Sequence, residues 1–152
     1  MSDLPFLQTW VSNPEDTRWF PVSTEKEIED YARNWMGFSR FRASLTAVHN
    51  EQPCAIGTLF LMPYRKVAHE CMLYMIVDPN FRKKGVGSSL LKNLLNLAEN
   101  YFSIEGMNIE IYEGCLLRSL LEKNGFEMYA KQENFVKEDT GYLSRILFDK
   151  FF

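Results

Sequence analysis

Three cations and two glycines stand together at residues Arg82–Gly87, in the order RKKGVG. This stretch follows an apolar run, Leu73–Val77, and precedes a leucine-rich stretch, Leu90–Ala98, so it lies where a strand is expected to give way to a helix. The first N–H groups of such a helix have no intrahelical partners, and its dipole places partial positive charge there, which suits a phosphate. Gly85 and Gly87 lack the Cβ atoms that keep an anion away from the backbone. The stretch therefore predicts a phosphate cradle, with a solvated basic turn as the alternative.

The motif differs from the loops that bind nucleotides. It lacks the GKS or GKT ending of a P-loop and the three-glycine GxGxxG spacing of a dinucleotide site. The strand before it continues a meander and does not open a parallel βαβ unit. A nucleoside triphosphate or a dinucleotide is therefore disfavoured as the ligand.

Composition is that of an ordinary globular chain. The 152 residues are 46% apolar and 24% charged, which predicts one domain spanning residues 1–152. The formal net charge of -3 argues against a nucleic-acid partner, because such proteins carry a basic face. We expect a monomer or a homodimer.

The three cysteines show neither paired spacing nor enough histidines for a zinc site. Cys54, Cys71 and Cys115 are odd in number, and His49 and His69 are the two histidines of the chain. No metal is expected, and free thiols are typical of a reducing compartment. The N-terminus has no basic segment before an apolar one, and no apolar run approaches 18 residues. We therefore expect a cytoplasmic protein without a membrane partner.

Hydrophobic periodicity predicts helices packed on a largely antiparallel sheet, an α+β fold. Thr24 and Glu27 have the spacing of a capping box, followed by an apolar stripe at helical spacing. The expected strands are Phe41–Ala47, Cys54–Met62, Ala68–Val77, Asn108–Tyr112, Phe126–Lys137 and Tyr142–Phe148, and the expected later helices are Ser88–Phe102 and Leu116–Asn124, the last closed by Gly125. The continuously apolar end of the third strand predicts a central position in the sheet.

Two segments resemble the signatures of one enzyme superfamily. IVDPNFRKKGVGSSLL is similar to the acyl-CoA signature of the GNAT N-acetyltransferases, R/Q-x-x-G-x-G/A after a V-x-P strand end, with Arg82, Gly85 and Gly87 at its fixed positions. LLEKNGF, residues 120–126, resembles the second signature of that superfamily. The resemblance covers roughly residues 41–148. It implies a GNAT-like mixed, mostly antiparallel sheet flanked by helices, with the first strand short or missing because the chain begins with helical patterns.

The resemblance also implies acetyl-CoA as co-substrate. The N–H groups from Lys83 to Ser88 would hold the pyrophosphate, and the backbone at Ile76 and Val77 would pair with the pantetheine arm. The full set implied for the cofactor is Ile76, Val77, Arg82, Lys83, Lys84, Gly85, Val86, Gly87, Ser88 and Ser89.

The catalytic groups are less regular. Many GNAT enzymes use a Tyr to serve the departing thiolate, and here Leu121 stands at that position. Tyr112 is the nearest substitute acid, with Cys115 and Ser119 as weaker ones and ordinary packing as the alternative for all three. For the base, Glu70 is our choice on the central strand, with a rim-exposed charge or a water relay as alternatives. Glu110 is interpreted as a surface residue.

The function expected from these residues is transfer of an acetyl group from acetyl-CoA to a primary amine, on a small molecule or a peptide N-terminus, directly within a ternary complex. The irregular catalytic positions leave a second interpretation, an acyl-CoA-binding regulatory module with little or no catalysis. A third is a protein-interaction domain whose basic turn binds nothing.

Overall fold

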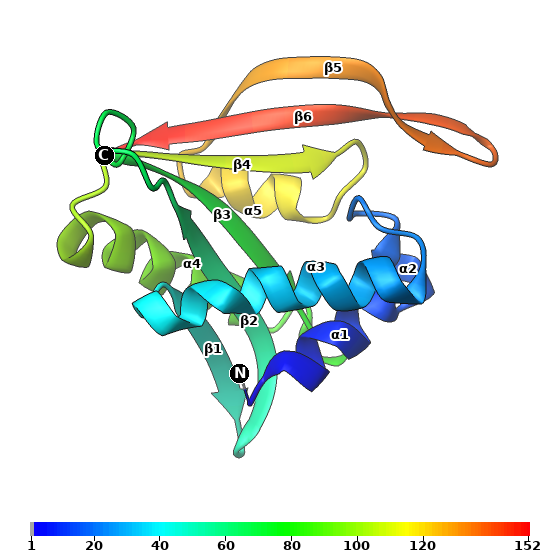
Figure 1. Cartoon of the computed structure of the whole chain (residues 1–152), viewed down its shortest axis with the longest axis horizontal. Coiled ribbons are helices and arrows are strands. Elements are labelled where there is room, and N and C mark those ends of the chain that lie inside the picture. Colours follow the sequence, from blue (N-terminus) through cyan, green and yellow to red (C-terminus); the bar gives the residue numbers. More distant parts are fainter. Residues whose placement is uncertain (1) are drawn as a thin grey trace.

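The computed structural model describes residues 2–152, and its centre is one mixed sheet of six strands (Figure 1). The strand order is β1-β2-β3-β4-β6-β5, in which β3 and β4 run parallel and every other neighbouring pair is antiparallel. The strands are β1 (Ser44–His49), β2 (Gln52–Leu61), β3 (Glu70–Val77), β4 (Gly106–Tyr112), β5 (Glu127–Glu138) and β6 (Gly141–Phe151). The predicted fold class and the central place of β3 are confirmed.

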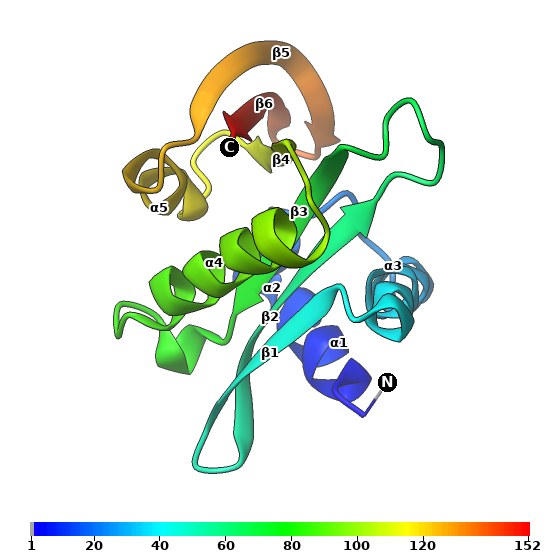
Figure 2. The ribbon, with the colours of Figure 1, turned by 90° about the vertical axis from the view of Figure 1, so that its left-hand side faces the viewer.

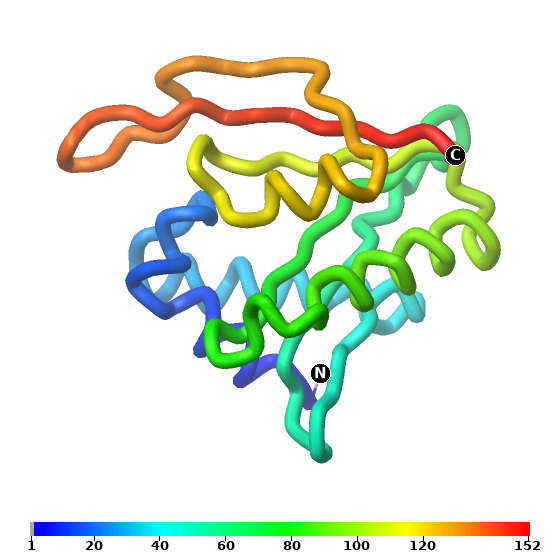
Figure 3. The backbone as a smooth tube through the Cα atoms, turned by 180° about the vertical axis from the view of Figure 1, so that it is seen from behind, coloured from blue at the N-terminus to red at the C-terminus, as the bar shows by residue number. Residues whose placement is uncertain are grey.

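Helices cover both faces of this sheet (Figure 2). The helices are α1 (Leu4–Ser12), α2 (Pro14–Thr17), α3 (Glu25–Gly37), α4 (Val86–Asn96) and α5 (Leu117–Lys123). Buried side chains of α1 and α3 meet Ile56 and Ile76 on one face. On the other face, α4 lies across the sheet (Figure 3), and its leucines join residues of α5 and every strand but β5 in a larger core. The sheet therefore separates two apolar cores.

The helix starts follow local chemistry. In α3 the Thr24 hydroxyl accepts a hydrogen bond from the Glu27 N–H (3.2 Å), and the Glu27 carboxylate accepts one from the Thr24 N–H (3.0 Å), so the predicted capping box is confirmed. The backbone N–H groups of Ser23 and Thr24, which donate to the Glu27 carboxylate, lower the pKa of Glu27. α1 begins with Pro5 in its first turn, where a missing N–H costs nothing.

Several predicted boundaries were wrong. Residues Phe38–Phe41 form a 3₁₀ turn, Arg42 follows with φ +59°, and the strand begins only at Ser44. The helix predicted to end at Phe102 stops at Asn96 and continues as a π-helical turn over Leu97–Tyr101. In the described part of the chain no strand precedes Ser44, in agreement with a missing first strand.

β3 and β4 diverge along their length. Their pairing covers only Glu70–Met72 of β3 against Gly106–Asn108 of β4. The Asp78 N–H donates to the Cys54 carbonyl on β2 (2.9 Å). Because peptide groups alternate in direction along an antiparallel strand, those of Ile76 face β2 while those of Met75 and Val77 face the side where β4 has moved away. The divergence therefore exposes a short row of β3 backbone groups.

The β5–β6 hairpin extends beyond β4. Tyr112, the last residue of β4, pairs with Arg145, so the first four residues of β6 have no β4 partner. β5 pairs with β6 irregularly: its register shifts between Gln132 and Val136, and Asn134 within that bulge has φ +55°. The hairpin runs along the top of the molecule in Figure 1.

Candidate functional site

The predicted phosphate cradle opens into a cavity of about 510 Å³, here called the loop cavity. It lies between the start of α4, the end of β3, α5 and the segment after α2. The predicted residues that line it are Ile76, Val77, Arg82, Lys83, Gly85, Gly87 and Ser88. The first hydrogen bond within α4 runs from the Ser89 N–H to the Gly85 carbonyl (3.0 Å). The N–H groups of Val86, Gly87 and Ser88 therefore have no intrahelical partner. The loop cavity thus has the anion-binding end of a helix in its wall.

The two glycines act in different ways. Gly85 has φ +83°, a conformation that a residue with a Cβ adopts only at a cost, and no atom lies within 4 Å of a Cβ placed there. Gly87 has an ordinary conformation, but a Cβ there would lie 3.3 Å from Leu120 Cδ2 and 3.4 Å from Val77 Cγ2. Gly85 therefore shapes the turn, and Gly87 allows α4 to approach the core closely.

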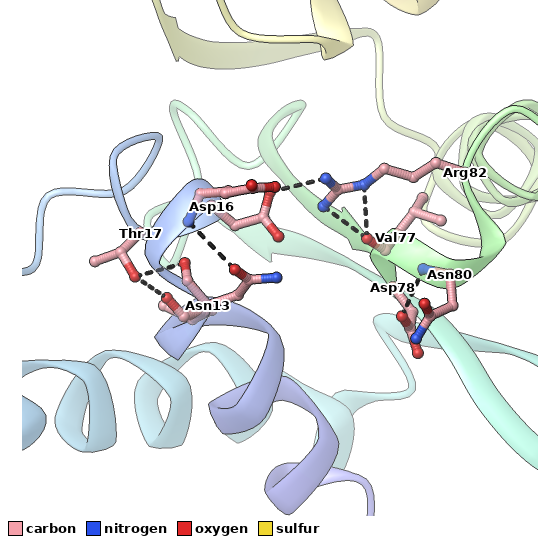
Figure 4. Close-up of polar contacts among 9 residues, drawn as sticks. Asn13, Asp16, Thr17, Val77, Asp78, Asn80 and Arg82 are labelled. Atoms are coloured by element: carbon pink, nitrogen blue, oxygen red, sulfur yellow. Dashed lines mark hydrogen bonds and ion pairs between the residues drawn. The ribbon is translucent and has the colours of Figure 1, made fainter.

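Arg82 makes contacts that differ from the predicted ones (Figure 4). Its Nε and Nη2 donate to the Val77 carbonyl (3.1 and 2.9 Å), and its Nη1 lies 2.8 Å from Asp16 Oδ1. The guanidinium of Arg82, which the resemblance placed among the cofactor residues, is therefore bound to other groups of the protein. Asp16 comes from α2, which no sequence pattern connected to this loop.

Asp16 is itself buried, with a side chain 3% exposed. Its Oδ2 atom is buried without a hydrogen-bond partner, while Oδ1 pairs with Arg82. A buried carboxylate is costly unless it is paired, so Asp16 depends on Arg82 and the two residues fix α2 against the cradle.

The other residues predicted for the cofactor lie outside the loop cavity. Lys84 is exposed, with its Nζ 5.5 Å from the centre of the Phe81 ring. Val86 packs against the larger core, and the N–H of Ser89 is already used within the helix. At the strand end, Ile76 lines the cavity while its peptide groups face β2, so Met75 and Val77 supply the free backbone groups.

A second, smaller cavity of about 150 Å³ lies beside the first, between β3 and β4 where they diverge. We call it the aromatic cavity. Its aromatic lining residues are Trp19, Phe20, Tyr31, Tyr74, Tyr112 and Phe135. Its one carboxylate in the described part of the chain is Glu110, whose side chain is 26% exposed and whose Oε2 lies 3.5 Å from Arg145 Nη1.

The structure places Tyr112 and Glu110 together in this cavity. They are two residues apart on β4 and so share one face of the strand. Burial raises the pKa of Tyr112 to about 12, with the nearby Glu110 carboxylate acting in the same direction. Tyr112 is therefore protonated near neutral pH. Glu110 stands two residues before Tyr112, and this spacing alone places both side chains on one face of the strand. Our interpretation of Glu110 as a surface residue overlooked that signal.

Glu70 is not brought together with these residues. It is the first residue of β3, and seven residues of strand at about 3.3 Å each separate it from Val77 by roughly 23 Å. Its Oε2 accepts a hydrogen bond from Asn108 Nδ2 (2.9 Å), and it lines neither cavity. Its carboxylate also occupies the space that a Cβ at Gly106 would fill. These contacts place Glu70 among the residues that hold β3 to β4.

The two cavities adjoin. Five residues line both of them: Trp19, Phe20, Met75, Cys115 and Leu117. Among these five, Cys115 alone carries an acidic hydrogen, and burial raises the pKa of its thiol. A molecule that extends from the cradle toward the aromatic cavity must pass this junction.

In residues 2–152, no cluster of three or more His, Cys, Asp and Glu side chains could hold a metal ion. None of the helices in that range has the length and apolar character needed to cross a membrane.

Comparison with solved structures shows what this fold is similar to. Ribosomal-protein-alanine N-acetyltransferase from Brucella melitensis superposes with a TM-score of 0.84 at 21% identity, covering 99% of this chain and 95% of that one. N-acetyltransferase from Staphylococcus aureus Mu50 gives 0.79 at 18% identity, covering 99% and 93%. The structure of yncA from Salmonella typhimurium with its cofactor acetyl-CoA gives 0.81 at 12% identity, covering 99% and 88%.

Sequence comparison gives the family itself. No curated protein sequence matches the chain. The family described as "Acetyltransferase (GNAT) domain" matches residues 42–128, more than half of the chain, including the cradle and α5. The chain therefore belongs to the GNAT acetyltransferase family, and it is an enzyme of the acyltransferase class.

Proposed function

We propose that the protein transfers an acetyl group from acetyl-CoA to a primary amine by direct attack within a ternary complex. The observation that supports this proposal is the junction between the loop cavity and the aromatic cavity. It lets a cofactor thioester and an acceptor amine meet without either leaving its own site. Holding two reactants in that way supplies a large part of the rate, because a bimolecular step becomes effectively unimolecular.

The cofactor would lie along the wall of the loop cavity. Its pyrophosphate would accept hydrogen bonds from the free N–H groups of Val86, Gly87 and Ser88 at the start of α4. Its pantetheine arm would add to β3 as a strand does, using the outward backbone groups of Met75 and the Val77 N–H. The Val77 carbonyl is occupied by Arg82, so it is left out of this assignment.

The acceptor would enter the aromatic cavity. We assign Glu110 as the group that takes a proton from the ammonium, directly or through water, because Glu110 is the carboxylate in the cavity wall. The neutral nitrogen attacks the thioester carbonyl, a C–N bond forms, and the C–S bond then breaks. Once Glu110 has released the first proton to water, it takes the second nitrogen proton as the tetrahedral intermediate collapses. The thiolate takes a proton from an acid, which is restored through water by the proton now on Glu110.

Two residues are suited to be that acid. Tyr112 lines the aromatic cavity and Cys115 lies at the junction, and the pKa of each is raised by burial, so both carry their proton near neutral pH. Tyr112→Phe and Cys115→Ala remove the two protons separately. The acid is the residue whose loss lowers kcat with little change in affinity for acetyl-CoA.

Solved neighbours with amine acceptors on proteins, such as the ribosomal-protein-alanine N-acetyltransferase, support an amine as the acceptor in general. The three free thiols, two of them buried, support our proposal of a reducing, cytoplasmic location.

The experiment is acetyl-CoA titration calorimetry followed by thiol release with a panel of primary amines. We expect saturable binding at one site and thiol release that depends on the amine. Binding without release from any amine would instead support the alternative of a regulatory acyl-CoA-binding module.

A further inference from the structure

The aromatic cavity has a size and lining that restrict its occupant. Its volume of about 150 Å³ is close to that of an engineered apolar cavity of about 150 Å³ that binds benzene. Six aromatic side chains contribute to its wall, and Leu73, Met75, Ile109 and Ile111 contribute apolar surface. Aromatic rings hold other rings in offset or edge-to-face contact and also attract a cation to their faces. The cavity can thus take one ring-sized apolar group together with one ammonium.

The charge around this cavity is balanced. Glu110 is its carboxylate within the described residues, and the Arg145 guanidinium lies 3.5 Å from it. The pair leaves little net negative charge to attract a second ammonium group. A polyamine or an aminoglycoside would therefore place a further cation beside apolar rings and an arginine, where burial of an unpaired charge is costly.

The outer wall comes from the β5 bulge. Phe135 lies within the register shift between Gln132 and Val136, and its ring centre lies 6.3 Å from that of Tyr112 on β4. The Arg145 guanidinium lies over the Phe135 ring, 4.0 Å from its centre. Phe135 therefore packs against Tyr112 of β4 and Arg145 of β6, and it closes the apolar part of the cavity.

From this geometry we infer that the acceptor is a compact monoamine that carries one aromatic or similarly sized apolar group. The inference rests on the proposed function and narrows its substrate class. The ammonium lies beside Glu110, and the apolar group lies among the rings closed by Phe135. A second cationic group on the acceptor has no partner among the described residues of the cavity wall.

Two pairs of amines test charge and ring separately. Pentylamine and 1,5-diaminopentane share a carbon chain and differ by one amino group, so their ratio of kcat/KM reports the second charge. Phenethylamine and ethylamine differ by the ring. We expect kcat/KM for pentylamine and for phenethylamine to exceed that of the partner amine by about tenfold or more, the factor that corresponds to 1.4 kcal/mol. Thiol release with saturating acetyl-CoA measures all four.

Phe135→Ala tests whether the wall carries the preference. We expect this variant to reduce the phenethylamine-to-ethylamine ratio several-fold, since the ring loses one apolar contact surface. Tyr129→Ala is the matched control, because Tyr129 lies on the same strand, is 53% exposed and lines neither cavity. The phenethylamine-to-ethylamine ratio of kcat/KM for Tyr129→Ala should equal that of the parent enzyme.

The outcomes separate the two proposals. Faster turnover of 1,5-diaminopentane, of an aminoglycoside or of a peptide N-terminus than of the monoamines overturns this inference and leaves the acetyltransferase function standing. An unchanged ratio in Phe135→Ala, with parental thermal stability, overturns the assignment of the ring to this cavity. Failure of every amine to release thiol from bound acetyl-CoA overturns the proposed function and this inference with it.

Discussion

At the scale of single residues, three acidic side chains in this fold have different environments. Glu110 faces the aromatic cavity, Glu70 bridges β3 and β4 away from both cavities, and Asp16 is buried against Arg82. Their residue type is nearly the same, so position decides the chemistry that each can perform.

Glu110→Gln should lower kcat by about 10²–10⁴-fold, the usual contribution of a positioned general base. The deficit should be largest at low pH, where the amine arrives protonated, and affinity for acetyl-CoA should stay near the parental value. kcat measured from about pH 6 to pH 9 checks this. Glu70→Gln is the matched control, since it removes a carboxylate from the same pair of strands. Equal losses of kcat in both variants would contradict the assignment of Glu110.

Asp16→Asn should destabilise the protein by about 3 kcal/mol, because breaking one side of a buried ion pair leaves the other charge uncompensated. Affinity for acetyl-CoA should fall as well, since Arg82 then holds the Val77 peptide less firmly. Urea unfolding and calorimetry measure the two effects. Glu29→Gln removes the acid of the exposed Arg33–Glu29 pair and should cost less than about 1 kcal/mol. A loss at Asp16 no larger than this would mean that the pair does not secure the cradle.

At the scale of elements, patterns among neighbouring residues predicted most of the secondary structure correctly, whereas contacts between distant segments were not predicted. The capping box of α3, the β-hairpins and the glycine-rich start of α4 depend on neighbouring residues, so periodicity and capping chemistry were enough to predict them. The first strand was predicted to start at Phe41 and starts at Ser44, because Phe41 and Ala43 extend the alternation of β1 backward although Phe41 ends a 3₁₀ turn.

The remaining parts of the site depend on tertiary contacts. Asp16 and Arg82 are far apart in the sequence, and Phe135, which lines the aromatic cavity, lies within a bulge of β5. Inside a bulge the period-two alternation does not predict where a side chain points, and no composition signal marks the position of the bulge. This is why the sequence predicted the glycine-rich turn that begins α4 and the candidate Tyr112, while the contacts of Asp16 and Phe135 were found only in the structure.

Gly85→Ala tests the turn that begins α4. The left-handed conformation at φ +83° should cost about 1–2 kcal/mol for a residue with a Cβ, and acetyl-CoA should bind more weakly because the cradle amides are displaced. Gly37→Ala is the control, since Gly37 ends α3 without a positive φ and has no atom within 4 Å of an added Cβ. That variant should keep or slightly raise stability. Calorimetry and thermal unfolding of the two variants give the comparison, and equal behaviour would contradict a conformational role for Gly85.

At the scale of the whole molecule, burial of tyrosine and thiol groups makes the stability of the fold decrease at alkaline pH. Burial raises the pKa of Tyr31 and Tyr74, raises that of Tyr112 to about 12 and raises that of the Cys71 thiol to about 12. Each group is uncharged when protonated, and in the unfolded chain each ionises at a lower pH, about 10 for Tyr and about 8.5 for Cys. As pH rises past these values the unfolded state loses protons first, so the folded state loses its advantage until the folded pKa is reached.

The urea midpoint should therefore be nearly constant up to about pH 7.5, begin to fall near pH 8.5 as the unfolded thiols ionise, and fall more steeply from about pH 9 to pH 11.5. Tyr31→Phe removes one of the titrating groups from the smaller core and should flatten this decline. Tyr142→Phe, at a position 57% exposed on the hairpin, should follow the parental curve. Exposed tyrosines contribute to the tyrosinate absorbance of the folded protein, so the parental signal minus that of Tyr31→Phe isolates Tyr31, whose ionisation should appear only with unfolding. A midpoint that stays constant to pH 11.5, or a Tyr31 difference signal that appears while the protein remains folded, would show that the aromatic walls of the site are more open to solvent than the structure has them.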